Sequence, residues 1–165
     1  MPKRDFLSLS DFSREELDAL LLRAIELKEE RSSNVIHNSL AGKTGILILA
    51  QNSTRTRIAF EAGMNQLGGH SIFLSDRDSQ ASRGESLEDF ARVVSEMADV
   101  VMTRNPEQKD IELLAKHASI PVINGMSSDL HPCQLLADMQ TFIELKGSIE
   151  GRSVAFIGDG FNMCN

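Results

Sequence analysis

Short, largely apolar runs alternate along this chain with segments whose apolar residues recur at helical spacing. The runs are four or five residues long, which is typical of strands buried on both faces of a parallel sheet. The runs predicted as strands are 46–50, 71–74, 99–103, 121–124 and 153–157, and the segments predicted as helices are 14–31, 58–67, 85–97, 107–118 and 132–146. This alternation predicts an α/β fold, with a parallel sheet of about four strands and helices on both faces.

The fifth apolar run, 153–157, suggests the start of a second domain. It follows Gly147, which we expect to end a long interdomain helix that begins at about residue 132, and only eight residues come after it. We therefore expect residues 1–147 to form one domain. Residues 148–165 would open a second α/β domain, with 153–157 as its first strand and the remainder lying outside this sequence.

The polar stretch from Gln51 to Arg57, which includes Ser53-Thr54-Arg55-Thr56-Arg57, directly follows the first predicted strand and precedes a helix expected from Ile58. A helix N-terminus offers unpaired N–H groups and a partial positive charge, and the hydroxyls and arginines of this stretch add further donors. A phosphate or carboxylate is the expected ligand. The alternative is an exposed helix start with solvated arginines. Because Arg55 and Arg57 are two residues apart and cannot face one spot, we assign Arg55 to the ligand and Arg57 to a structural ion pair.

Two further polar residues follow predicted strands. Arg104 comes after the third strand, and His131 comes after the fourth and immediately before Pro132, the expected first residue of a long helix. Taken alone, the arginine could be a strand-end charge and the histidine a hydrogen-bonded loop residue. Because the carboxyl ends of parallel strands meet at one edge of a sheet, we expect Arg55, Arg104 and His131 to share one crevice.

Composition narrows the possible functions. The formal net charge of −7 over 165 residues argues against a nucleic-acid partner. No apolar run approaches the roughly 18 residues of a membrane span, and the first residues lack the apolar core of a signal peptide, so we expect a cytoplasmic protein without a membrane partner. Cys133 and Cys164 do not indicate a disulfide framework, and no histidine or cysteine cluster has metal-ligand spacing. We therefore expect no metal.

Several ordered motifs together resemble the aspartate/ornithine carbamoyltransferase family. They are Ser53-Thr54-Arg55-Thr56-Arg57, Phe60-Glu61, residues 66–69, Arg83-Gly84-Glu85-Ser86, His131-Pro132-Cys133-Gln134 and Ala137-Asp138, and the likeness begins at Arg4. The ornithine-using branch is the more similar, because aspartate-using relatives typically carry Thr at the position of Cys133. The resemblance spans essentially the whole chain, in which residues 1–147 correspond to the carbamoyl-phosphate-binding domain.

The resemblance implies transfer of a carbamoyl group from carbamoyl phosphate to the δ-amino group of L-ornithine, giving L-citrulline and phosphate without a metal or organic cofactor. It further implies a homotrimer or a multiple of trimers. The residue roles that it implies are phosphate binding by Ser53, Thr54, Arg55 and Thr56, contact with the carbamoyl oxygen by Arg104 and His131, orientation of the carbamoyl amide by Gln134, contact with the neighbouring subunit's site by Gln80 and Arg83, and contact with ornithine by Asn165.

The sequence is also compatible with other functions. The amine could instead be aspartate, putrescine or an acylated ornithine, or the chain could be a non-catalytic carbamoyl-phosphate-binding or assembly module. The family's second domain carries most of the amine site, so we expect these residues alone not to turn over. Departures from the family pattern, at Gln51-Asn52, Arg83 and Phe161, bear on affinity more than on the class of reaction.

Overall fold

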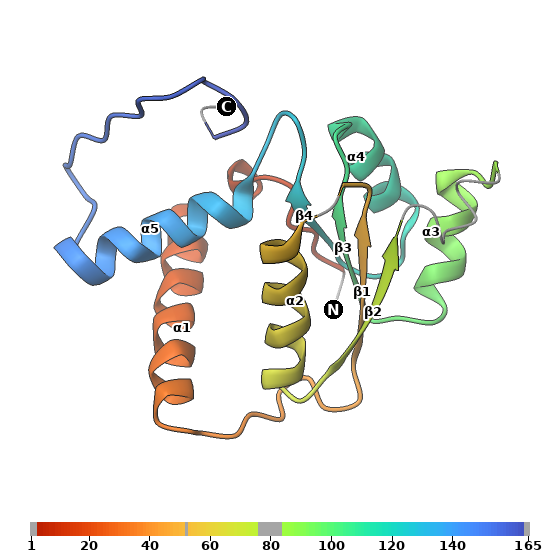
Figure 1. The fold of residues 1–165 in the computed structure, drawn as a ribbon, viewed down its shortest axis with the longest axis horizontal. Helices are drawn as coiled ribbons and strands as arrows, with labels where there is room; N and C mark the ends of the chain where they lie inside the picture. The colour runs from red at the N-terminus through yellow and green to blue at the C-terminus, as the bar shows by residue number, and fades with distance from the viewer. Residues whose placement is uncertain (1–2, 52, 76–83, 164–165) are drawn as a thin grey trace.

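A computed structural model describes residues 3–51, 53–75 and 84–163 of the chain and shows an α/β fold (Figure 1). Its elements are η1 (Leu9–Asp11), α1 (Arg14–Ser32), β1 (Thr44–Leu49), α2 (Thr54–Gln66), β2 (His70–Ser75), α3 (Leu87–Ser95), β3 (Val100–Arg104), α4 (Gln108–His117), β4 (Val122–Met126) and α5 (Pro132–Lys146). The four strands are parallel and lie in the order β2-β1-β3-β4. The predicted fold class is confirmed.

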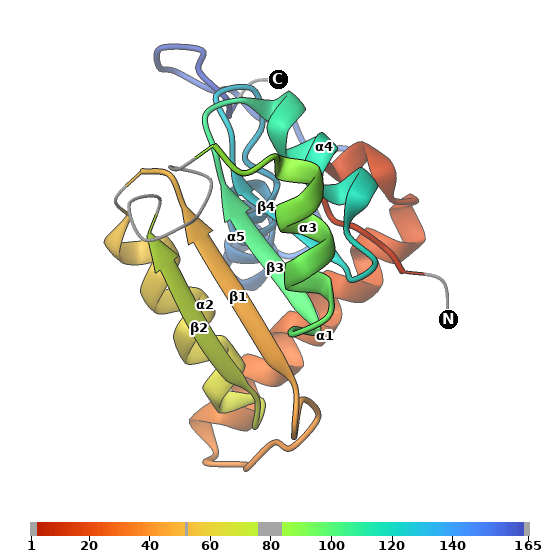
Figure 2. The same ribbon diagram turned by 90° about the vertical axis from the view of Figure 1, so that its right-hand side faces the viewer.

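Helices cover both faces of the sheet. Figures 1 and 2 show α3 and α4 on one face, and α2 and α5 on the other, with α1 packed on α5. Successive residues of β1 serve opposite faces, because side chains alternate along a strand. Ile46 joins the core beneath α3 and α4, whereas Leu47 packs with Met102 and Phe60 beneath α2. Each face of the sheet thus has its own apolar core.

Cap residues set the ends of several helices. The Ser13 hydroxyl accepts from the backbone N–H of Glu16 (3.3 Å), and the Glu16 carboxylate accepts from that of Ser13 (2.8 Å), a capping box that starts α1 where it was predicted. Ser86 caps α3, which therefore begins at Leu87 and not at residue 85 as predicted. Pro132 starts α5 and Gly147 ends it at a φ of 77°, and both ends agree with the prediction.

The strand predicted over 153–157 is not formed. These residues lie outside the sheet, and their apolar side chains face solvent, with Val154 73%, Phe156 55% and Ile157 97% exposed. An apolar run becomes a strand only where a neighbouring strand satisfies its backbone, and no strand within the described part of the chain pairs with it. The segment instead runs back over α5 (Figure 1), and the buried Asn162 side chain donates to the Ser127 carbonyl (2.5 Å).

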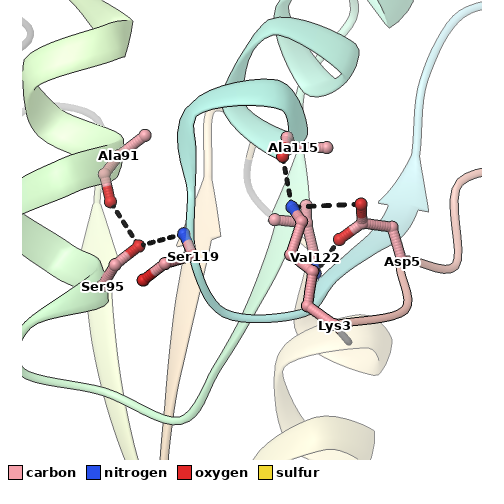
Figure 3. A network of polar contacts seen from close by, with 7 residues as sticks. All are labelled: Lys3, Asp5, Ala91, Ser95, Ala115, Ser119 and Val122. Atoms are coloured by element: carbon pink, nitrogen blue, oxygen red, sulfur yellow. Dashed lines mark hydrogen bonds and ion pairs between the residues drawn. The ribbon is translucent and has the colours of Figure 1, made fainter. Parts of the chain in front are cut away.

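The N-terminal segment extends the sheet beyond β4. Phe6 forms a parallel bridge with Ile123, and its N–H donates to the Val122 carbonyl (2.8 Å). Figure 3 shows that the Asp5 carboxylate accepts from the Val122 N–H (2.9 Å) and that Lys3 donates to a carbonyl of α4. These bonds cover the β4 edge, which would otherwise present unpaired backbone groups.

A serine ties the two helices of the same face together. The Ser95 hydroxyl, at the end of α3, donates to the Ala91 carbonyl (2.6 Å) and accepts from the Ser119 N–H (3.0 Å), just after α4 (Figure 3). These contacts lie at the opposite end of the sheet from the strand C-termini. They stabilise the packing of α3 and α4 at the N-terminal ends of the strands, away from the C-terminal ends where a site is expected.

Candidate functional site

A cavity of about 250 Å³ opens at the carboxyl ends of the strands. Its walls come from α2, the ends of β3 and β4, and the start of α5, and the lining residues are Arg55, Thr56, Ala59, Phe60, Arg104, Gly125, His131, Cys133, Gln134 and Ala137. The chain crosses from β1 to β2 on one side and proceeds to β3 and β4 on the other, so the strand order reverses between β1 and β3. Ligands of open α/β sheets bind at such a reversal.

The N-terminus of α2 forms one wall. α2 begins at Thr54, whereas periodicity predicted a start at Ile58, because the Ser53 hydroxyl caps the helix by accepting from the Thr56 N–H (3.4 Å). Arg55 therefore sits in the first helical turn, where backbone N–H groups have no intrahelical acceptor and the helix dipole is positive. The wall offers donors and positive charge to an anion.

The two neighbouring arginines diverge, as the sequence predicted. Arg57 forms an ion pair with Glu61 one turn along α2 (2.9 Å), and its guanidinium lies 3.8 Å from the centre of the Phe73 ring. Arg55 lines the cavity and is exposed. The ion pair expected of Arg57 is confirmed, and Arg55 is left with its guanidinium at the cavity.

Arg104 ends β3 beside the cap of α2. β1 pairs with β3 so that Leu49 lies opposite Arg104, which brings the guanidinium to Ser53 and Thr56: Nη1 donates to both hydroxyls at 3.3 Å. Its buried Nε has no hydrogen-bond acceptor among the described residues. Burial, and then the like charge of Arg55, lower the pKa of Arg104. Two cations held this close favour an anionic ligand between them.

His131 occupies the N-cap position of α5 and is half-buried. Burial first, and then the charge of Arg104, lower its pKa, while the Asp138 carboxylate acts in the opposite direction. The imidazole is therefore neutral at pH 7, with one nitrogen a donor and the other an acceptor. Nδ1 is buried and finds no partner in the part of the chain that the structure describes. A neutral imidazole can donate to a carbonyl oxygen without placing a third charge at the cavity.

The first turn of α5 supplies two more lining residues. Burial raises the pKa of Cys133 to about 11, and its Sγ donates to the Asn124 carbonyl (3.4 Å), so this thiol is a protonated packing group and not a nucleophile. The Gln134 amide donates from Nε2 to the Asp138 carboxylate (3.0 Å). Gln134 thus presents an oriented carboxamide at the cavity wall.

Some lining residues were not singled out from the sequence. Ala59 and Phe60 follow Arg55 and Thr56 by four residues each, so the helical period of α2 could have placed them on the same wall. Gly125 lies in β4, where a Cβ would overlap the Met102 sulfur. A glycine inside a strand often indicates that another group packs closely against the backbone at that position.

The other predicted site residues lie beside the cavity or outside the residues that the structure describes. Ser53 touches Arg104 and caps α2, and Thr54 is the exposed first residue of that helix; neither lines the cavity. Gln80, Arg83 and Asn165 lie outside the described residues. Within residues 3–51, 53–75 and 84–163, no group of three or more His, Cys, Asp and Glu is placed to hold a metal ion, and no helix is long and apolar enough to cross a membrane.

Comparison with known proteins decides the family. The sequence profile of the aspartate/ornithine carbamoyltransferase carbamoyl-P binding domain matches residues 4–144. The chain belongs to the aspartate/ornithine carbamoyltransferase family. The resemblance inferred from the motifs is thereby confirmed, and the cavity lies within the matched domain.

Members of the carbamoyltransferase family match over all or nearly all of the chain. An ornithine carbamoyltransferase of Hydrogenovibrio crunogenus is 54% identical over 165 residues, which are 100% of this chain and 55% of that protein. The solved ornithine carbamoyltransferase of Pyrococcus furiosus is 46% identical, with a TM-score of 0.93 over 96% of this chain and 51% of its own. An aspartate transcarbamoylase of Trypanosoma cruzi, solved with carbamoyl phosphate and aspartate, is 30% identical, with a TM-score of 0.89 over 96% of this chain and 53% of its own. The chain spans about half the length of these relatives.

Proposed function

We propose that the cavity binds carbamoyl phosphate and that the protein transfers its carbamoyl group to the δ-amino group of L-ornithine, giving L-citrulline and phosphate. The observation that carries this proposal is the convergence of Arg55, Arg104 and the N-terminus of α2 on one cavity at the strand reversal. Although the chain has a formal net charge of −7, positive charge is concentrated at this cavity. Identity supports ornithine as the amine, since relatives named for ornithine reach 54% and the aspartate transcarbamoylase 30%.

The phosphate end of the ligand fits the N-terminus of α2. Arg55 offers a planar fork of donors that matches phosphate oxygens, and the first-turn N–H groups and the hydroxyl of Thr56, which also lines the cavity, offer more. We assign the hydroxyls of Ser53 and Thr54, which lie next to the lining residues in the chain, to the phosphate as well. Ser53 and Thr56 both accept from Arg104, and the Ser53 hydroxyl donates to the Thr56 oxygen (2.9 Å), so the Thr56 hydroxyl can donate its proton to the ligand, whereas the Ser53 proton becomes available only if that bond breaks. Charge-assisted bonds of this kind contribute roughly 1.5–3 kcal/mol each.

The carbamoyl end then meets Arg104, His131 and Gln134. Attack of the amine nitrogen on the carbonyl carbon forms the C–N bond and places negative charge on the carbonyl oxygen. Arg104 and the neutral imidazole of His131 lie at the cavity wall as donors for that oxygen. Collapse of the intermediate breaks the C–O bond, phosphate leaves toward the cations at α2, and the proton of the amine nitrogen passes to the departing phosphate.

The proposal also assigns roles to residues that the structure does not describe. We assign Asn165 to ornithine, and Gln80 and Arg83 to the neighbouring subunit's site in a homotrimer, and we place the protein in the cytoplasm. Residues 1–147 would act as the carbamoyl-phosphate-binding domain, with 148–165 leading into the ornithine-binding part. Because the chain spans about 55% of an ornithine-using relative, we expect the 165 residues alone to bind carbamoyl phosphate without forming citrulline.

An amine-competition assay tests the proposed reaction. The complete polypeptide that contains these residues is incubated with carbamoyl phosphate and ornithine, aspartate or putrescine, and both phosphate and the carbamoylated amine are quantified. We expect citrulline and phosphate in equal amounts with ornithine, and a loss of both in Arg104→Gln. Carbamoylation of aspartate or putrescine in preference to ornithine would refute the choice of amine, and full activity in Arg104→Gln would refute the site.

A further inference from the structure

The cavity wall on α5 contains a carboxylate that does not itself line the cavity. Gln134 and Ala137 line it, whereas Asp138, one turn after Gln134, is exposed and is not among the lining residues. The Asp138 Oδ1 accepts from Gln134 Nε2 at 3.0 Å. Asp138 is thus bonded to a residue that lines the cavity without lining it itself.

A carboxylate fixes which way a neighbouring amide turns. An ionised carboxylate can only accept hydrogen bonds, whereas an amide has a donor end and an acceptor end. The Gln134 amide must therefore present its nitrogen to Asp138. Its oxygen is turned to the opposite side of the amide, as an acceptor.

The polarity of this amide matters for a carbamoyl ligand. The carbamoyl group ends in an –NH2, which is a donor and needs an acceptor. An acetyl group of the same shape ends in a methyl, which offers no hydrogen bond. An acceptor oxygen at this wall distinguishes the two, because burying an acceptor against a methyl leaves it unpaired.

We propose that Asp138 is a positioning residue, which orients the Gln134 amide oxygen toward the ligand –NH2 and so makes the site select carbamoyl phosphate over acetyl phosphate. The inference rests on the proposed function, since it takes the ligand of the cavity to be carbamoyl phosphate. Asp138 acts through Gln134 and does not touch the ligand. The phosphate end of the ligand, at α2, is outside its reach.

The charge of Asp138 also acts on a second residue that lines the cavity, His131. Burial and Arg104 lower the pKa of His131, and Asp138 is the group that opposes them. The carboxylate thus stands close enough to the lining residues to act on two of them, Gln134 by a hydrogen bond and His131 by charge. An exposed ion far from the site would do neither.

The same helix provides a matched control. Gln140 donates from Nε2 to the Glu144 carboxylate at 2.9 Å, which is the same glutamine-to-carboxylate pair at the same spacing of four residues. The other Glu144 oxygen pairs with Lys28 of α1 (2.5 Å), so replacing Glu144 removes more structural contacts than replacing Asp138 and makes the control a stringent one. Neither residue lines the cavity. A purely structural role for such pairs, which stabilise a helix by about 0.2–0.5 kcal/mol, would be shared by both.

Calorimetric titration of the 165-residue chain separates the two roles. Freshly dissolved carbamoyl phosphate, acetyl phosphate and inorganic phosphate are titrated into wild type, Asp138→Asn, Asp138→Ala and Glu144→Gln, and circular dichroism checks that each variant is folded. We expect the wild type to prefer carbamoyl over acetyl phosphate by about tenfold, the effect of one unpaired acceptor. Both Asp138 variants should bring this ratio toward one and change the affinity for inorganic phosphate less than twofold, while Glu144→Gln keeps the wild-type ratio.

The outcomes distinguish the inference from the function on which it rests. An unchanged ratio in both Asp138 variants overturns the positioning role, and so does an equal loss of affinity for all three ligands. A wild type that binds none of the three overturns the proposed ligand itself. A wild type that binds carbamoyl and acetyl phosphate equally overturns the selectivity while leaving the anion site in place.

Discussion

Replacing Arg55 with alanine separates ligand binding from folding. Arg55 is exposed and lines the cavity, and it lies in the first turn of α2, where a positive charge opposes the helix dipole by about 0.3–1 kcal/mol. It also stands close enough to Arg104 for the like charge to lower the pKa of that guanidinium. We therefore expect Arg55→Ala to leave the free energy of unfolding of the ligand-free chain unchanged or a few tenths of a kcal/mol higher.

The expected loss of affinity follows from the bonds removed. A charge-assisted hydrogen bond contributes about 1.5–3 kcal/mol, and each 1.4 kcal/mol is a factor of ten in Kd. A single bond from Arg55 to phosphate therefore corresponds to a rise in Kd of about 10- to 150-fold. Calorimetric titration with carbamoyl phosphate measures this change, and urea unfolding without ligand measures stability.

Arg57→Ala is the matched control, because it removes the same side chain two residues away. Arg57 pairs with Glu61 and lies over the Phe73 ring, contacts worth about 0.2–0.5 and 0.5–1 kcal/mol. We expect this variant to lose stability and to keep its affinity within twofold. Wild-type affinity in Arg55→Ala, or equal losses of affinity in the two variants, would refute the assignment of Arg55 to the ligand.

Three residues that line the cavity, Gly125, His131 and Cys133, can each be tested by a separate perturbation. The surroundings of His131 lower its pKa below the ordinary 6.5, so the unfolded chain binds more protons near that pH than the folded chain does. The free energy of unfolding of wild type, relative to that of His131→Asn, should therefore decrease as the pH falls from 8 to 5, as measured by urea unfolding. An increase over the same pH range would contradict the lowered pKa. With Cys164→Ser as background, iodoacetamide at pH 8 should alkylate Cys133 roughly a hundredfold more slowly in the folded chain than in urea, because burial raises its pKa from 9.0 to about 11; equal rates would show an accessible thiolate. Gly125→Ala should lower the free energy of unfolding by about 1–3 kcal/mol, since the added methyl would overlap the sulfur of the buried Met102, and an unchanged thermal midpoint would show that this packing can relax.

Local signals were sufficient where a side chain itself ends a helix. The structure reproduces the helix boundaries predicted at Ser13, Pro132 and Gly147. A capping hydroxyl, the fixed φ of proline and the positive φ of glycine each act on the nearest backbone groups, so they can be read from the local sequence. The start of α2 was placed four residues late for the opposite reason. Apolar periodicity begins at Ile58, but the cap at Ser53 determines where the helix starts, and the exposed first turn carries no apolar signal.

Pairing of distant segments could not be obtained from local pattern. The run 153–157 has the apolar composition of a buried strand, yet it is exposed and outside the sheet. Whether such a run becomes a strand depends on a partner strand, and that partner is a property of the fold and not of the run.

The site was predictable in its polar groups because parallel strands place their carboxyl ends at one edge. This rule brought Arg55, Arg104 and His131 to a single cavity without any knowledge of side-chain packing. The apolar part of the wall and the bond from Gln134 to Asp138 were not singled out. Gln134 and Asp138 are four residues apart, a spacing at which helical side chains can form a hydrogen bond. Whether that bond matters for the site depends on which face of α5 lines the cavity, and this is not visible in the sequence.

A crystal structure of this chain with carbamoyl phosphate, or with the stable carboxamide analogue phosphonoacetamide, tests the central claim most directly. We predict phosphate oxygens within about 3 Å of the first backbone N–H groups of α2 and of the Arg55 guanidinium, and the carbonyl oxygen at a similar distance from Arg104 and His131. A ligand bound in the reverse orientation, with its carboxamide at α2, would contradict the account. So would an anion bound away from the strand ends.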